Sequence, residues 1–376
     1  MTSPRFLLQI DGEEAADLYP DVVQVEVELD EEEAAVFRVE LSITMASDGA
    51  WSHVDDERLA PWRRAGIQVG FDDGFELLVS GLLTRVDTTF QADEGRCRIE
   101  LWGSDESALL DRTERLRAWP DKTDSDIAGE IFAEYALGST VDVTAPVHGA
   151  KVSTIVQRET DLQFLRRLAR RNGFECFIED GKGFFRAPPP PTNPQPLLAA
   201  HFGGETTVTA FAVRLDARTP TDVGMFQLDR TEKTVLTTTV SDTRQRALGA
   251  VRAADLRPAG LDPAAAFVAM SASTGPAEMT PLCQSLYDRN DWFVTGEGVV
   301  DGAGYGAVLR PRRPVTIKGV GERHSGLYLV SHVTHTLDAG GYVQRFRVKR
   351  NAVGVTGAED FGDAGPGLLG ALGALA

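Results

Sequence analysis

Apolar and polar residues alternate along most of the first 105 residues. The alternation begins between Val23 and Leu29, and further alternating or apolar runs follow at 37–43, 67–71, 76–85 and 97–102. A period of two residues is typical of half-buried β-strands. Because short turns and no helices separate these runs, residues 1–105 are predicted to form a small antiparallel barrel. Gly81 interrupts one run and predicts a bulge or a sharp bend.

The period changes to three or four residues in the next segment, 106–187. A helix is expected after Thr123 or Ser125, and a second one after Thr160, where Thr160 and Gln163 have the spacing of a capping box. Gly173 supplies a left-handed stop for this second helix. Helices mixed with short strands predict an α/β insertion over residues 106–187.

Four prolines at 188–191 mark a stiff boundary, after which strand patterns return. A second barrel is expected from residues 188–241 and 292–351, interrupted by a helical and loop-rich insertion at 242–291. Residues 352–376 are rich in Gly and Ala and are expected to form a flexible tail. The predicted fold class is therefore α+β and mainly β, with two related antiparallel barrels that each carry an insertion.

Charge is distributed unevenly along the chain. Its 376 residues carry 38 basic and 56 acidic side chains, a net charge of −18. This balance argues against direct binding to nucleic acid or to an anionic membrane surface. The densest acidic run, Asp30 to Glu33, fits either a solvated hairpin tip or a patch for a basic partner. The arginines at 166, 167, 170 and 171 indicate a solvated or inter-subunit face rather than a phosphate site.

Catalytic and cofactor motifs are missing from the sequence. The glycines between Gly302 and Gly306 precede Pro311 and are expected to form a wide hairpin instead of a dinucleotide loop. His332 and His335 have an odd spacing on a predicted strand, which places them on opposite faces and argues against a shared metal ion. The three cysteines are far apart and fit a reducing compartment. We therefore expect no cofactor and no metal, and we favour a protein without enzyme activity over a hydrolase that uses a pair of carboxylates.

The segment from Gln157 to Glu175 resembles the phage late control protein D and VgrG-type hub proteins. The residues that carry this resemblance are Arg158, Glu159, Thr160, Asp161, Phe164, Leu165, Leu168 and Gly173. Two strand motifs agree with it, one at 81–84 with 101–105 and one at 326–335 with 341–351. The OB-fold and spike that follow in VgrG proteins are not expected in this chain, so the resemblance covers the hub part.

The resemblance implies a structural hub in the baseplate of a contractile phage tail or phage-like injection system. A homotrimer would form a pseudo-sixfold ring that adapts a hexameric inner tube, or tube-initiator protein, to a separate trimeric spike. Baseplate wedge proteins and a cargo effector are further candidate partners. The protein would be cytoplasmic during assembly and then reside in the baseplate. A carbohydrate-active hydrolase and an effector-binding module are the alternatives. The apolar stripe expected to dock the spike consists of Leu368, Leu369, Leu372 and Leu375.

Overall fold

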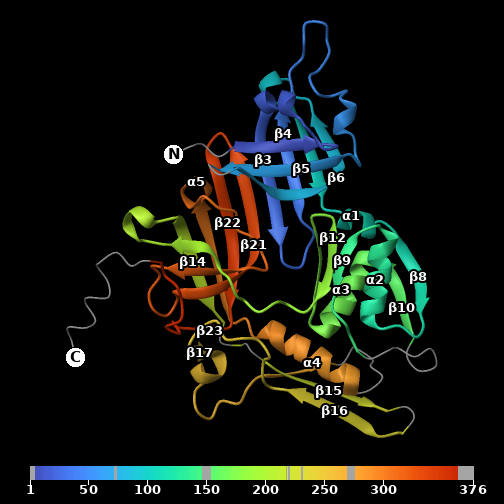
Figure 1. Ribbon diagram of the computed structural model, residues 1–376, viewed down its shortest axis with the longest axis vertical. Helices are drawn as coiled ribbons and strands as arrows, with labels where there is room; N and C mark the ends of the chain where they lie inside the picture. The colour runs from blue at the N-terminus through green and yellow to red at the C-terminus, as the bar shows by residue number, and fades with distance from the viewer. Residues whose placement is uncertain are drawn as a thin grey trace.

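Strands dominate the computed structural model, which describes residues 5–71, 74–145, 154–216, 218, 221–229, 232–268 and 276–362. Their buried side chains gather in four separate hydrophobic clusters. Two clusters fill the strand-rich halves, and two lie in smaller units that contain the longer helices. Figure 1 shows the first half at the top, the second half below it, and the smaller units at the right and at the bottom.

The first half is an antiparallel sheet, and its core also includes Val308, Leu337 and Tyr342 of the second half. It contains β1 (Arg5–Ile10), β2 (Glu13–Glu14), β3 (Val22–Asp30), β4 (Val36–Ser42), β5 (Arg64–Phe71), β6 (Gly74–Thr89) and β7 (Arg98–Ser104). Its spatial order is β3-β4-β7-β6-β5-β1-β2. As the alternation predicts, Val25, Val27 and Leu29 are buried while the residues between them face outward. Gly81 lies within β6, two residues before a register shift.

The α/β insertion follows directly after β7. It contains α1 (Ser107–Leu110), β8 (Glu114–Trp119), α2 (Asp124–Glu134), β9 (Gly138–Val141), β10 (Ile155–Thr160), α3 (Asp161–Asn172), β11 (Glu175–Glu179) and β12 (Lys182–Arg186). Thr123 caps α2 and Thr160 caps α3 through their hydroxyl groups. Gly173 ends α3 with a φ of 71°, a conformation that favours glycine.

The second half repeats the strand order of the first. It contains β13 (Gln195–Ala199), β14 (Val208–Leu215), β19 (Val294–Asp301), β20 (Pro314–Lys318), β21 (Gly326–Asp338) and β22 (Gly341–Arg350). The hydrogen-bonded order is β14-β19-β22-β21-β20-β13, which matches β3-β4-β7-β6-β5-β1 strand for strand. The corresponding strands also follow one another along the chain in the same order. One pair differs in direction: β13 pairs with β20 in parallel, whereas β1 and β5 are antiparallel.

The two halves share one 13-stranded sheet. The joint is the antiparallel pair of β21 and β3, which runs from His332 opposite Asp30 to Asp338 opposite Gln24. Residues about 300 positions apart in the sequence are thereby neighbours in the same ladder. The sheet therefore continues from one half to the other.

The second insertion is larger than the predicted 242–291. Strands β15 (Asp222–Leu228) and β16 (Val235–Val240), expected in the second barrel, instead form a separate sheet with β18 (Ala265–Val268). Helix α4 (Pro276–Asn290) covers one face of this sheet, and Val223 and Met225 pack there against Met279 and Cys283. The boundary was wrong because alternation identifies a half-buried strand without identifying what it packs against.

Two other expectations need correction. The chain after Asn351 does not become a tail at once, because β23 (Ala352–Val353) is buried and pairs with β17 (Val251–Arg252). The Nη2 of Arg350 also donates to the carbonyl of Gly354. The expected hairpin at the glycines is one helical turn, α5 (Gly302–Tyr305), capped by the carboxylate of Asp301. The four leucines of the predicted stripe lie outside the described residues.

Candidate functional site

The acidic turn, Asp30 to Glu33, lies where the parts of the molecule meet. Asp30 ends β3, and its Oδ1 accepts hydrogen bonds from the amides of Glu32 at 2.8 Å and Glu33 at 3.1 Å. Its Oδ2 lies 3.1 Å from Nδ1 of His332 on β21. Although burial alone would raise the pKa of Asp30, the His332 side chain and the two amides lower it to about 2. The carboxylate therefore fixes both the turn and the joint between the halves.

Each glutamate of the acidic turn has a basic partner within the chain. Glu31 lies 2.6 Å from Lys349 on β22, and Glu33 lies 2.6 Å from Arg166 on α3. Glu32 pairs with Arg289 at the end of α4 and lies 3.6 Å from Arg170 on α3. The side chain of Glu31 is only 20% exposed, so this residue is not part of a solvated tip. Glu33 remains 64% exposed.

These contacts also locate the arginines of α3. Arg166 and Arg170 meet the acidic turn, and Arg167 lies 2.7 Å from Glu159. Arg171 pairs with Asp124, the first residue of α2. The helix face expected to be solvated or inter-subunit thus forms ion pairs inside the chain, and the acidic run and the basic helix bind one another.

Arg312 fills the centre of this junction. Its guanidinium lies 3.6 Å from the centre of the Phe177 ring, and Nη1 donates to the carbonyl of Asp30 at 2.5 Å. Burial lowers the pKa of Arg312, while Glu179 and Glu175 act in the opposite direction. Arg312 belongs to the run Arg310-Pro311-Arg312-Arg313-Pro314, and nothing in this run signals its role. Only the fold shows that it joins β3 to the α/β insertion.

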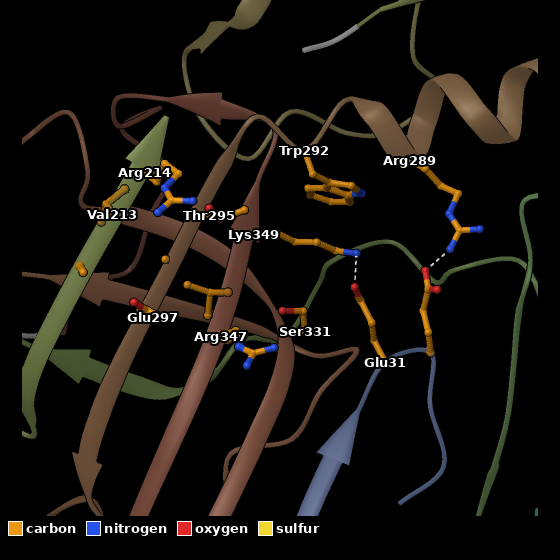
Figure 2. A pocket seen from close by; sticks show the side chains of 14 residues that line it. Glu31, Val213, Arg214, Arg289, Trp292, Thr295, Glu297, Ser331, Arg347 and Lys349 are labelled. Atoms are coloured by element: carbon orange, nitrogen blue, oxygen red, sulfur yellow. Dashed lines mark hydrogen bonds and ion pairs between the residues drawn. The ribbon is translucent and has the colours of Figure 1, made fainter. Parts of the chain in front are cut away.

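A cleft of about 530 Å³ opens beside the acidic turn, and we name it the Trp292 pocket. Strands β14, β19 and β22 form its floor, and Trp292 lies at one end beside α4 (Figure 2). Lys349 reaches from the floor to Glu31, and its ammonium also lies 4.8 Å from the Trp292 ring centre. Four basic side chains line the cleft: Arg214, Arg289, Arg347 and Lys349. Arginine and tryptophan are both enriched in protein–protein interfaces.

The residues of the family motif hold α3 in place. Asp161 is fully buried, and its carboxylate accepts from Gln157 at 2.7 Å and Tyr135 at 2.6 Å and lies 2.9 Å from Arg115. Thr160 caps the helix and donates to Asp111 at 2.5 Å.

The other motif positions divide between core and surface. Phe164, Leu165 and Leu168 are completely buried in the core of the α/β insertion, whereas Arg158 is exposed. Taken together, the motif residues stabilise a helix and do not converge on a reactive group.

The histidines of β21 face opposite sides of the sheet, as their spacing predicts. His332 faces outward to Asp30, and His335 is buried with its Nδ1 2.8 Å from the Tyr342 hydroxyl. Burial lowers the pKa of His335 to about 3, so the ring is neutral at physiological pH. The part of the chain that the structure describes contains no group of three potential metal ligands. None of its helices is long and apolar enough to cross a membrane.

Solved structures of tail proteins share this fold over nearly the whole chain. A 43 kDa tail protein of prophage MuSo2 from Shewanella oneidensis is 15% identical, with a TM-score of 0.66, covering 93% of this chain and 100% of that one. A tail protein from Neisseria meningitidis is 14% identical, with a TM-score of 0.66 and coverage of 94% and 98%. A component of the Escherichia coli type VI secretion system is 12% identical, with a TM-score of 0.54 and coverage of 91% and 76%.

At these identities the likeness shows the fold, a mainly antiparallel β architecture shared with phage tail proteins. No curated protein matches the chain in sequence. The family model that does match is described as the Alg8 N-terminal domain and covers residues 2–339. This model is not one for late control protein D. The findings therefore support the predicted resemblance at the level of the tail-protein fold. Because the match spans most of the 376 residues, the chain belongs to the Alg8 N-terminal domain family.

Proposed function

We propose that this protein is the structural hub of a baseplate, in a contractile phage tail or a phage-like contractile injection system. Three copies would form a ring that connects a hexameric inner tube to a separate three-fold spike, with wedge proteins around it. The role is architectural and involves no catalysis. The tail-protein fold of the solved relatives supports the proposal.

The observation that carries the proposal is the repeat within the chain. Two halves with the same strand order join edge to edge in one sheet. A chain built from two like units offers six like units when three copies close a ring. Such a ring can meet a hexameric tube on one side and a trimeric spike on the other.

The division into units fits this role. The two halves would make the wall of the ring, and the α/β insertion and the unit built on α4 would face neighbouring baseplate proteins. The ion pairs of Glu33 with Arg166 and of Glu32 with Arg289 hold the two insertions against the wall. The residues after Gly362, with Leu368, Leu369, Leu372 and Leu375, would dock the spike.

Light scattering on the purified full-length chain tests the proposal. A hub should have a mass near three times the 40.7 kDa of one chain and should retain its spike protein on a column. A monomer of 40.7 kDa that hydrolyses polysaccharides would overturn the proposal in favour of a carbohydrate-active enzyme.

A further inference from the structure

Several strand edges have no partner among the described residues, and two of them belong to β14 and to β6. Strand β14 lies at one end of the main sheet. The second part of β6, from Arg85 to Thr89, pairs with β7 on one side only, because β5 pairs with β6 only as far as Leu82. Arg85, Thr88 and Thr89 are exposed, and the ring of Phe90 beyond them is 54% exposed. Unpaired edges of this length are sites for pairing with another chain.

The internal repeat indicates how these edges pair. Strand β6 of the first half corresponds to β21 of the second, and β14 corresponds to β3. Within the chain, β21 and β3 form the joint between the halves. A pair of β6 with β14 would therefore combine the counterparts of the two joint strands. Both strands are unpaired where the joint would require them to be free.

The register shifts align the counterparts residue by residue. Strand β6 shifts between Leu83 and Arg85, and β21 shifts between Val330 and His332, which makes Arg85 the counterpart of His332. Likewise β3 shifts just before Gln24 and β14 just before Ala210. Counting six residues onward from each makes Asp216 the counterpart of Asp30.

We propose that β6 of one copy pairs antiparallel with β14 of a second copy of this chain, in the register of the β21–β3 joint. This inference rests on the proposed function for the closed ring and adds the strands and residues that close it. The facing pairs would be Arg85 with Asp216, Val86 with Leu215, Asp87 with Arg214, Thr88 with Val213, Thr89 with Ala212, and Phe90 with Phe211.

The outer row of this pairing is complementary in charge. Arg85 meets Asp216 in the position that His332 and Asp30 occupy in the internal joint, where the two side chains lie 3.1 Å apart. The next outward pair, Asp87 with Arg214, is also of opposite charge. In the single chain Arg85 lies 2.9 Å from Asp87, with the two side chains 59% and 44% exposed. Opposite charges directly across a ladder favour pairing, and like charges oppose it.

The inner row is mainly apolar. Val86 would face Leu215, and Phe90 would face Phe211, which already packs against the rings of Tyr328 and Phe346. The internal joint has the same character, since Val333 faces Leu29 and Leu337 faces Val25. Pairing would therefore continue the core from one copy to the next and cover the exposed Phe90 ring. Because the two edges differ, the contact is head-to-tail and can close into a ring.

Disulfide trapping in the full-length chain tests the register. Directly opposite residues of antiparallel strands are close enough for a disulfide, whereas residues offset by two positions are too far apart. The double variant Thr89→Cys/Ala212→Cys should become covalently linked between chains under mild oxidation. Thr89→Cys/Arg214→Cys, offset by two positions, is the matched control and should cross-link at least tenfold more slowly. The three native cysteines are buried, which limits interference.

The possible outcomes distinguish a failure of the β6–β14 pairing from a failure of the proposed trimeric hub. Covalent species that end at three chains support both. Covalent species that continue beyond three or end at another number support the joint and contradict the trimeric hub. A trimer by light scattering that cross-links no faster than the control overturns the joint and leaves the hub standing. A chain that remains monomeric and uncross-linked, with a wild-type circular dichroism spectrum, overturns the joint.

Discussion

One added methyl group at Gly81 should strongly destabilise the first half. A Cβ at this position would lie 2.0 Å from the carbonyl oxygen of Ser104 and 2.8 Å from the Cα of Asp105. Both are backbone atoms at the end of β7, so no side-chain rotation can relieve the contact. Overpacking a buried site usually costs 1–3 kcal/mol, and with a backbone obstacle we expect the upper end, about 3 kcal/mol for Gly81→Ala.

The same chemical change at Gly129 provides a control of opposite sign. Gly129 lies inside α2, and outside its two chain neighbours and the helix's own backbone an added Cβ would meet no heavy atom within 4 Å. Alanine is favoured over glycine in a helix by about 0.5–1 kcal/mol. Gly129→Ala should therefore stabilise α2 slightly.

Hydrogen–deuterium exchange with mass spectrometry can measure both effects, because it reports on each segment and needs no two-state unfolding of the whole chain. A loss of about 3 kcal/mol corresponds to exchange on the order of 100-fold faster in peptides from β6 and β7. In Gly129→Ala, peptides from α2 should exchange about two- to fivefold more slowly. If Gly81→Ala exchanges at the wild-type rate in β6 and β7, the close approach of these backbones is wrong.

Three further variants test other parts of the account. Leu168→Ala empties a fully buried position and should cost about 2–5 kcal/mol, whereas Leu116→Ala, at an 82% exposed position, should cost less than about 0.5 kcal/mol in urea unfolding. Because the folded pKa of Asp30 lies near 2, below its ordinary 3.8, its carboxylate stabilises the fold above pH 4 and loses this effect as pH falls toward 2. Asp30→Asn should thus be about 1–2 kcal/mol less stable at pH 6, allowing for solvent screening, and the gap should close on acidification; a constant gap would refute this. Deletion after Gly362 should leave the trimer intact and abolish spike retention, and undiminished spike binding would refute the docking role of the tail.

Local sequence patterns predicted much of the fold. Alternation located the strands around Val25 and Phe37, and the capping residue Thr160 with Gly173 bounded α3 to within one residue. These signals depend on neighbours in the sequence, where period and capping act. The same signals assigned β15 and β16 to the wrong unit, because a strand with one apolar face can pack on a sheet or on a helix equally well.

The ion pairs of the acidic turn could not be predicted from the sequence, for a different reason. Glu31 and Lys349 are 318 positions apart, and Arg166 and Glu33 are 133 positions apart. The sequence shows both the acidic run and the basic helix, and for each it predicts a solvated face or an external partner. Neither segment indicates the other, because residues this far apart in the sequence come together only when the whole chain has folded.

Electron microscopy of the purified full-length protein tests the central claim most directly. The account predicts ring-shaped particles with three-fold symmetry, six similar lobes in the wall and an open central hole. Particles the size of one 40.7 kDa chain, or closed assemblies without a hole, would contradict it.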